Sequence, residues 1–137
     1  MADVKRVLPA VDAESREFWE AAARGEFAYK RCVSCGRAHW YPRPHCPYCH
    51  ADGTTWESTA GGGTVYTFTV IRQNSSSAFR DWVPYAMGMV DLDGGPRVFA
   101  RFVGDISGLA VGSRVEVSHE RVGDVDVPVF VTAAEVP

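Results

Sequence analysis

The sequence lacks long apolar runs. No stretch of its 137 residues approaches the roughly 20 apolar residues that a membrane-spanning helix needs. The opening segment, MADVKRVLPAVDAESREF, is also without the apolar centre of a secretory signal peptide. The hydrophobic fraction of 46% and the charged fraction of 23% are ordinary for a globular protein. We therefore expect a cytoplasmic protein of medium size that makes no membrane contact.

Cysteine is scarce, and all four copies lie close together in the chain. Cys32 and Cys35 form one Cys-x2-Cys pair, and Cys46 and Cys49 form a second pair ten residues later. Two such pairs predict a single tetrahedral zinc site with Zn–S bonds of about 2.3 Å. Because sulfur fills every coordination position, no position is left for water or substrate. The spacing therefore predicts a structural metal.

Other uses of the same residues stay open at this point. Paired spacing is also compatible with two disulfides, although nothing in the sequence signals secretion. A Cys3His site would replace one sulfur with His45 or His50, and His39 is a further histidine of the segment. An electron-transfer iron site would use the same four sulfurs. We take the four-cysteine zinc site as the prediction.

Acidic residues are absent from residues 27–51. This segment carries Lys30, Arg31, Arg37 and Arg43, whereas the remainder of the chain has 10 basic and 17 acidic residues. Four thiolates around one Zn²⁺ leave a net charge of −2, and nearby cations offset it. The alternative is a basic patch that also meets an anionic ligand.

An amphipathic helix is predicted over residues 12–24. Asp12 is a suitable N-cap, and the pair at 24–25, Arg-Gly, supplies a C-terminal stop. The apolar stripe of this helix includes Phe18 and Trp19. That stripe covers either the body of this protein or a partner subunit.

The C-terminal part of the sequence changes to strand patterning with turn signals between the strands. Asp-Gly-Gly-Pro at 93–96 predicts a hairpin, and residues 105–110 predict a short helical bridge. The five predicted strands are residues 64–72, 85–92, 97–103, 114–119 and 127–136.

Five strands with a bridge between the third and fourth describe a five-stranded OB-fold barrel. Periodicity alone also allows an SH3-like barrel or a small sandwich. The chain as a whole is mainly β and is expected to divide into an N-terminal helical segment, a zinc ribbon and the barrel. The expected boundaries are 1–26, 27–55 and 56–137.

The order of these motifs is similar to that of a known family. CVSCG precedes WYPRPHCPYC, and GGGTVYTFTV and VPYA follow at the starts of the first two barrel strands. Together they resemble the domain of unknown function 35 family over residues 14–136. The resemblance implies an OB-fold protein with an N-terminal rubredoxin-like zinc ribbon.

The resemblance also implies a function. Members of the family are non-catalytic accessory subunits of thiolase-like or aldolase-like enzymes that act on acyl-CoA thioesters, including lipid, steroid side-chain and aromatic acyl-CoA. Some relatives are fused to acyl-CoA hydratases or pair with them. We therefore expect a hetero-oligomer, with coenzyme A or acyl-CoA as a possible ligand.

The residues themselves favour binding over catalysis. An enzyme needs a nucleophile with a base, an acid–base pair or an open metal site. The cysteines are committed to metal, His119 lies in a predicted strand, and Asp124 and Asp126 lie in a predicted hairpin loop. The sequence therefore predicts no catalytic set.

Nucleic-acid binding is the main alternative function, because both zinc ribbons and OB folds bind nucleic acids. Phosphate neutralisation requires a positive excess. Residues 64–136 instead carry six arginines against nine acidic residues. The charge balance therefore disfavours this alternative.

Two groups of residues are predicted to make contacts outside the chain. Coenzyme A needs an apolar slot and cations, and the ribbon offers both within one short segment. The predicted ligand residues are Arg37, Trp40, Tyr41, Pro42 and Arg43. The loop at 74–84 adds Phe79 and Trp82 to Phe18 and Trp19 as predicted partner-interface residues, since aromatic residues are enriched at interface hot spots. Packing within the chain is the alternative for both groups.

Overall fold

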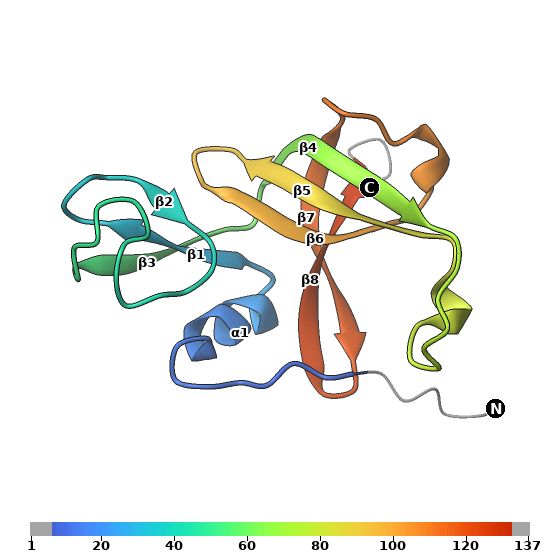
Figure 1. Cartoon of the computed structure of the whole chain (residues 1–137), viewed down its shortest axis with the longest axis horizontal. Helices are drawn as coiled ribbons and strands as arrows, with labels where there is room; N and C mark the ends of the chain where they lie inside the picture. The colour runs from blue at the N-terminus through green and yellow to red at the C-terminus, as the bar shows by residue number, and fades with distance from the viewer. Residues whose placement is uncertain (1–6, 133–137) are drawn as a thin grey trace.

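The computed structural model describes residues 7–132, in which a small three-stranded sheet joins a closed barrel (Figure 1). Neither the α-helix nor the two 3-10 turns of this part is long and apolar enough to cross a membrane. The elements in chain order are α1 (Arg16–Ala23), β1 (Phe27–Cys32), β2 (Ala38–His39), β3 (Thr54–Thr59), β4 (Gly62–Ile71), η1 (Arg80–Trp82), β5 (Tyr85–Leu92), β6 (Arg97–Val103), η2 (Ile106–Gly108), β7 (Arg114–Val122) and β8 (Val125–Thr132).

Helix α1 begins later than the sequence predicts. The Asp12 carboxylate accepts a hydrogen bond from the Ser15 N–H at 2.8 Å, and Ser15 Oγ accepts one from the Asp12 N–H at 3.1 Å. This reciprocal pair closes a separate turn, so Ser15 rather than Asp12 occupies the N-cap position. The predicted stop is confirmed: Gly25 has a φ of 84°, and the Glu26 N–H returns to the Ala21 carbonyl.

The ribbon sheet has the order β2–β1–β3. Strand β1 ends at Cys32 and so leads directly into the first cysteine pair. Strand β3 was not predicted to belong to the ribbon, yet it pairs along all of β1, from Phe27 opposite Thr59 to Cys32 opposite Thr54. The ribbon sheet therefore runs on to residue 59.

The barrel closes in the order β4–β5–β6–β8–β7, and β7 pairs back onto β4. The five-stranded closed barrel is thus confirmed, with β5 and β6 at the predicted bounds and η2 as the predicted bridge. Gly88 on β5 shows why a small barrel needs glycine. A Cβ at this position would lie 2.2 Å from the Thr67 carbonyl oxygen on β4.

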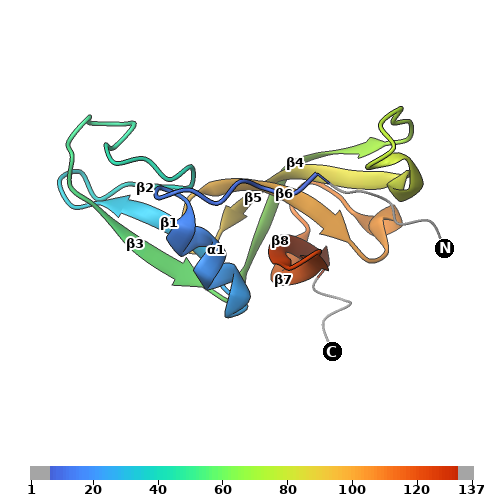
Figure 2. The same ribbon diagram turned by 90° about the horizontal axis from the view of Figure 1, so that it is seen from below.

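One core joins the ribbon, the helix and the barrel. Phe27 of β1 stacks on Phe130 of β8 with ring centroids 5.9 Å apart, and Phe18 of α1 packs edge-on against Phe27. Figure 2 shows α1 between the ribbon sheet and the β7–β8 hairpin. The aromatic contacts therefore place the ribbon and the helix against one side of the barrel.

Candidate functional site

The four cysteines of the ribbon form one cluster. Their sulfur atoms all lie within 4.8 Å of one another, with Cys32 Sγ 3.6 Å from Cys49 Sγ and Cys35 Sγ 3.7 Å from Cys46 Sγ. Tetrahedral zinc with bonds of about 2.3 Å separates its sulfurs by about 3.8 Å, whereas a disulfide holds them about 2.05 Å apart. The four sulfurs therefore fit a structural zinc ion and do not form disulfides.

Backbone amides of two matching turns point at the sulfurs. Cys32 Sγ accepts from the N–H groups of Ser34 and Cys35, at 3.3 and 3.4 Å, and Cys46 Sγ accepts from the Tyr48 N–H at 3.3 Å. The residue after each pair has a positive φ, 77° at Gly36 and 66° at His50. His50 thus occupies the place of a glycine in the second turn.

The pKa values of the clustered thiols and the repulsion between their thiolates favour binding of a cation. The Cys35 N–H is the main reason that the pKa of Cys32 falls to about 6. At Cys49 the Ala51 N–H is the largest single influence and favours the thiolate. The three neighbouring sulfurs and burial together outweigh it, so the pKa rises to about 11. Four thiolates at this spacing repel one another, and a divalent metal bound by all four sulfurs removes that repulsion.

The histidines of the ribbon lie apart from this arrangement. His45 and His50 are exposed, and neither belongs to the cluster of potential metal ligands found in residues 7–132. His39 is buried on β2, and burial lowers its pKa and favours the neutral ring.

The ribbon cations divide into two kinds. Lys30 and Arg31 are engaged within the fold, since Lys30 lies over the Trp56 ring and Arg31 forms an ion pair with Glu57. Arg37 and Arg43 are exposed and stack on tyrosine rings. Within residues 7–132 neither of these two has a carboxylate partner, so both are free to meet an anion.

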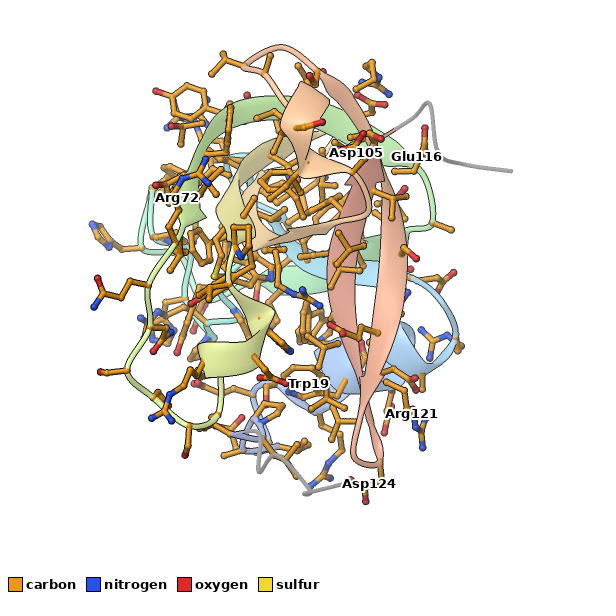
Figure 3. All side chains as sticks on the ribbon, turned by 90° about the vertical axis from the view of Figure 1, so that its right-hand side faces the viewer. Trp19, Arg72, Asp105, Glu116, Arg121 and Asp124 are labelled. Atoms are coloured by element: carbon orange, nitrogen blue, oxygen red, sulfur yellow. The ribbon has the colours of Figure 1, made fainter. Side chains whose placement is uncertain are left out.

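A large apolar pocket of about 570 Å³ lies where the helix, the barrel and the loop after β4 meet. Its lining is almost entirely apolar. All four aromatic residues predicted for a partner interface lie in its wall: Phe18, Trp19, Phe79 and Trp82. Figure 3 shows Trp19 between the η1 loop and the β7–β8 hairpin. The structure therefore brings these residues together from two distant segments.

Two polar pairs interrupt the apolar wall. Asn74 Nδ2 donates to the Tyr85 hydroxyl at 2.9 Å. The Arg101 guanidinium forms an ion pair with Glu120 and lies under the Trp82 ring, 3.9 Å from its centroid. The Arg101 side chain is only 16% exposed, so this charge is held within the wall and not on an open surface.

The residues predicted to contact coenzyme A are split between two environments. Trp40 turns inward and lines the large pocket, and with Tyr41 and Pro42 it also lines a smaller adjoining cavity of about 210 Å³. Arg43 covers the Tyr41 ring from outside, at 4.7 Å from its centroid, while Arg37 lies over Tyr48. The segment therefore joins an apolar cavity to exposed cations.

Arg101 and Glu120 are the site residues that sequence reasoning missed. In the sequence both counted only toward the charge balance of residues 64–136. Alternation along β6 places Arg101 on the outer side of the barrel, and that side becomes a pocket wall only because α1 and the η1 loop lie over it. No local pattern in the sequence carries this information.

Two family models match consecutive parts of the chain. The rubredoxin-like zinc ribbon domain of ChsH2 matches residues 19–55, and the C-terminal OB-fold domain of ChsH2 matches residues 56–120. A DUF35 domain-containing scaffold protein of Methanothermobacter thermautotrophicus is 30% identical over 94 residues, which cover 67% of this chain and 70% of that protein. This chain belongs to the DUF35 family. The predicted family resemblance is thereby confirmed.

Other proteins similar to this DUF35 chain include one described as an enzyme subunit and two solved structures. A "Probable enoyl-CoA hydratase alpha subunit" of Thermomonospora curvata is 30% identical over 99 residues, which cover 72% of this chain but only 30% of that protein. A solved chain described as "Ltp2-ChsH2(DUF35) aldolase" has a TM-score of 0.78 at 27% identity, covering 92% of this chain and 99% of that one. A DUF35 structure from Sulfolobus solfataricus, at 12% identity and a TM-score of 0.63, shares the fold.

Proposed function

We propose that this chain is a non-catalytic accessory subunit of an enzyme that acts on acyl-CoA thioesters, with a thiolase-like or aldolase-like partner. The observation that carries the proposal is the similarity along nearly the full length of a solved chain described as an aldolase assembly of Ltp2 and ChsH2. The relative described as a hydratase alpha subunit and those described as scaffold proteins support the same class of role.

The chemistry of the described residues supports a binding role. The cysteines form a closed metal site, and the His119 ring nitrogen Nε2 is engaged with the Glu26 carbonyl at 3.2 Å. The chain instead offers a pocket with aromatic walls and, on the ribbon, exposed cations.

Contacts to the partner and to coenzyme A are part of this proposal. Trp19 and Phe79 are half-buried at the large pocket, so each keeps a surface for a partner protein. Arg37 and Arg43 are the cations for the phosphates of coenzyme A, and Tyr41 and Pro42 are the apolar surface beside them.

A nucleic-acid interface receives less support from the same surface. Four barrel arginines are in ion pairs with carboxylates, which leaves little uncompensated positive charge for a phosphate backbone. These pairs are Arg97–Asp91, Arg101–Glu120, Arg114–Asp93 and Arg121–Asp126.

The experiment is co-expression with a thiolase-like or aldolase-like enzyme encoded beside this chain. We expect a complex that survives gel filtration, and higher activity on acyl-CoA than the enzyme shows alone. The enzyme purified without this chain is the control. Separate elution at micromolar concentration, with enzyme activity indifferent to added chain, would contradict the proposal.

A further inference from the structure

The large pocket has the size and the apolar lining of a small-molecule site. Its volume of about 570 Å³ falls within the range of about 300–1,000 Å³ that is typical of small-molecule sites. Its lining includes the buried residues Phe27, Ala100 and Val129 and three of the four tryptophans of the chain: Trp19, Trp40 and Trp82. A long apolar group fits such a lining.

Arg101 adds a specific polar feature to this wall. A guanidinium carries five N–H donors. Within residues 7–132, the only carboxylate or carbonyl that accepts from it is Glu120, through Nη2. Trp82 covers the guanidinium and only 16% of the side chain is exposed, yet its remaining nitrogens are not among the fully buried unpartnered atoms. They keep accessible surface, where a ligand oxygen could replace water.

The ring of Trp40 adds to the apolar lining. Its indole N–H has almost no accessible surface and no acceptor in the described part of the chain, so this nitrogen does not face the open pocket. Arg101 is therefore the charged donor of the lining, and it favours a ligand that combines an apolar body with an acceptor.

The charge of the lining favours a neutral acceptor over an anionic one. Glu120 compensates the charge of Arg101, and a carboxylate ligand at this place would be repelled by Glu120. A carbonyl oxygen accepts a hydrogen bond without adding charge. The carbonyl of a thioester meets this requirement, whereas that of a free fatty acid at neutral pH does not.

We propose that this pocket binds the apolar acyl chain of an acyl thioester, whose carbonyl oxygen accepts a hydrogen bond from Arg101. The choice of a thioester rests on the proposed function. The apolar chain and the neutral hydrogen-bond acceptor are inferred from the lining of the pocket itself. The chain would then hold part of the substrate of its partner enzyme. Exposed rim residues such as Phe99 and Leu8 would remain for that partner to cover.

The pocket tryptophans give a direct measurement. Zinc-loaded full-length chain is titrated with dodecanoyl-CoA that carries bromine near the methyl end of the acyl chain, because bromine quenches indole fluorescence only at short range. We expect saturable quenching of most of the emission, with Trp56, which is not part of the lining, as the unquenched remainder. Unbrominated dodecanoyl-CoA should reverse the quenching, and coenzyme A alone should not.

Ligand variations test the two parts of the proposal separately. Removing two methylenes should weaken binding roughly tenfold, because each buried methylene contributes about 0.8 kcal/mol. Brominated dodecanoate should bind more weakly than the thioester at neutral pH. Equal or tighter binding of the carboxylate would overturn the assignment of the carbonyl to Arg101.

Protein variants complete the test. Val127→Phe fills the pocket and should abolish quenching, with Val122→Phe as a second variant if the first fails to fold. Arg101→Met combined with Glu120→Gln removes the donors without leaving an unpaired charge, and should weaken thioester binding up to about tenfold. Val111→Phe, at an exposed residue outside the pocket, is the matched control and should leave the quenching unchanged.

The outcomes separate this inference from the proposed function. Absence of quenching by the wild-type chain, or quenching that persists in a folded Val127→Phe variant, would overturn the acyl pocket. A stable complex with an enzyme but no quenching would leave the accessory role intact and refute the pocket alone. Quenching without any enzyme complex would support the pocket and refute the accessory role.

Discussion

Arg31 of the ribbon donates a hydrogen bond from Nη2 to the carbonyl of Gly94, 2.8 Å away in the hairpin between β5 and β6. The same guanidinium donates from Nη1 to the Gly36 carbonyl at 2.8 Å and forms an ion pair with Glu57 at 2.9 Å. One side chain therefore connects the first cysteine turn, the ribbon sheet and the barrel.

Replacing this connection should loosen the ribbon on the barrel. Arg31→Ala should lower the free energy of unfolding by about 1–2 kcal/mol, since hydrogen bonds to charged groups contribute more than neutral ones and this side chain is about one-third exposed. Urea denaturation measures the change. Arg31→Lys should recover only part of it, because an ammonium lacks the planar fork. Arg121→Ala, which breaks an exposed pair, is the control and should cost far less.

Removing one metal ligand should release the zinc and unfold the ribbon. Cys46→Ser replaces a buried sulfur with a poor zinc ligand, and the small ribbon depends on its metal for stability. We expect loss of the single zinc ion and of several kcal/mol of apparent stability. Elemental analysis and thermal unfolding measure both. Ser34→Ala, between the cysteines of the first pair, is the control, and full zinc retention in Cys46→Ser would refute the site.

Acidification should speed the release of zinc. The pKa of Cys32 is lowered to about 6, chiefly by the Cys35 N–H, so its thiolate is favoured in the folded chain. The resulting stabilisation is present above the ordinary thiol pKa of about 8.5 and is lost as pH falls through about 6. A colorimetric chelator should therefore capture zinc faster below about pH 6 than above pH 8. A rate of release that does not rise on acidification would contradict this account.

The coenzyme A contact is tested at Arg43. Arg43→Ala removes an exposed guanidinium that has no carboxylate partner in residues 7–132, and should weaken coenzyme A binding by the assembled complex several-fold. Zinc content and thermal stability should be unchanged. Titration calorimetry compares the coenzyme A affinity of complexes that contain wild type, Arg43→Ala or Arg72→Ala. Arg72 is an exposed arginine outside the ribbon and both cavities, so its variant is the control. Equal affinities for the three complexes would show that Arg43 does not contact coenzyme A.

The partner interface is tested at Trp82. Trp82→Ala removes a half-buried ring from the η1 loop and should weaken the enzyme complex at least tenfold, as expected for an aromatic hot spot. Sedimentation without acyl-CoA keeps substrate binding out of the measurement. The barrel should stay folded, because the ring lies outside its core cluster. Val111→Ala, an exposed apolar residue away from the pocket, should leave the complex intact.

Local chemistry made much of this protein predictable from sequence. Two Cys-x2-Cys pairs bring their own sulfurs together through tight turns, so the metal cluster needed no knowledge of the remaining fold. Strand periodicity and the Asp-Gly-Gly-Pro turn likewise gave the bounds of β5 and β6, because alternation and turn conformation are properties of neighbouring residues.

Tertiary structure alone decided how separate segments meet. Strand β3 joins the ribbon through hydrogen bonds to β1, a choice that its own side chains do not encode. Phe79 and Trp82 were predicted to contact a partner, and the loop around η1 brings them to the same pocket as Phe18 of the helix. Arg101 and Glu120 become a partly buried pair because β6 and β7 lie on either side of β8 in the barrel. The metal site depends on residues close in sequence, whereas the pocket depends on contacts between distant segments, which only the folded chain brings together.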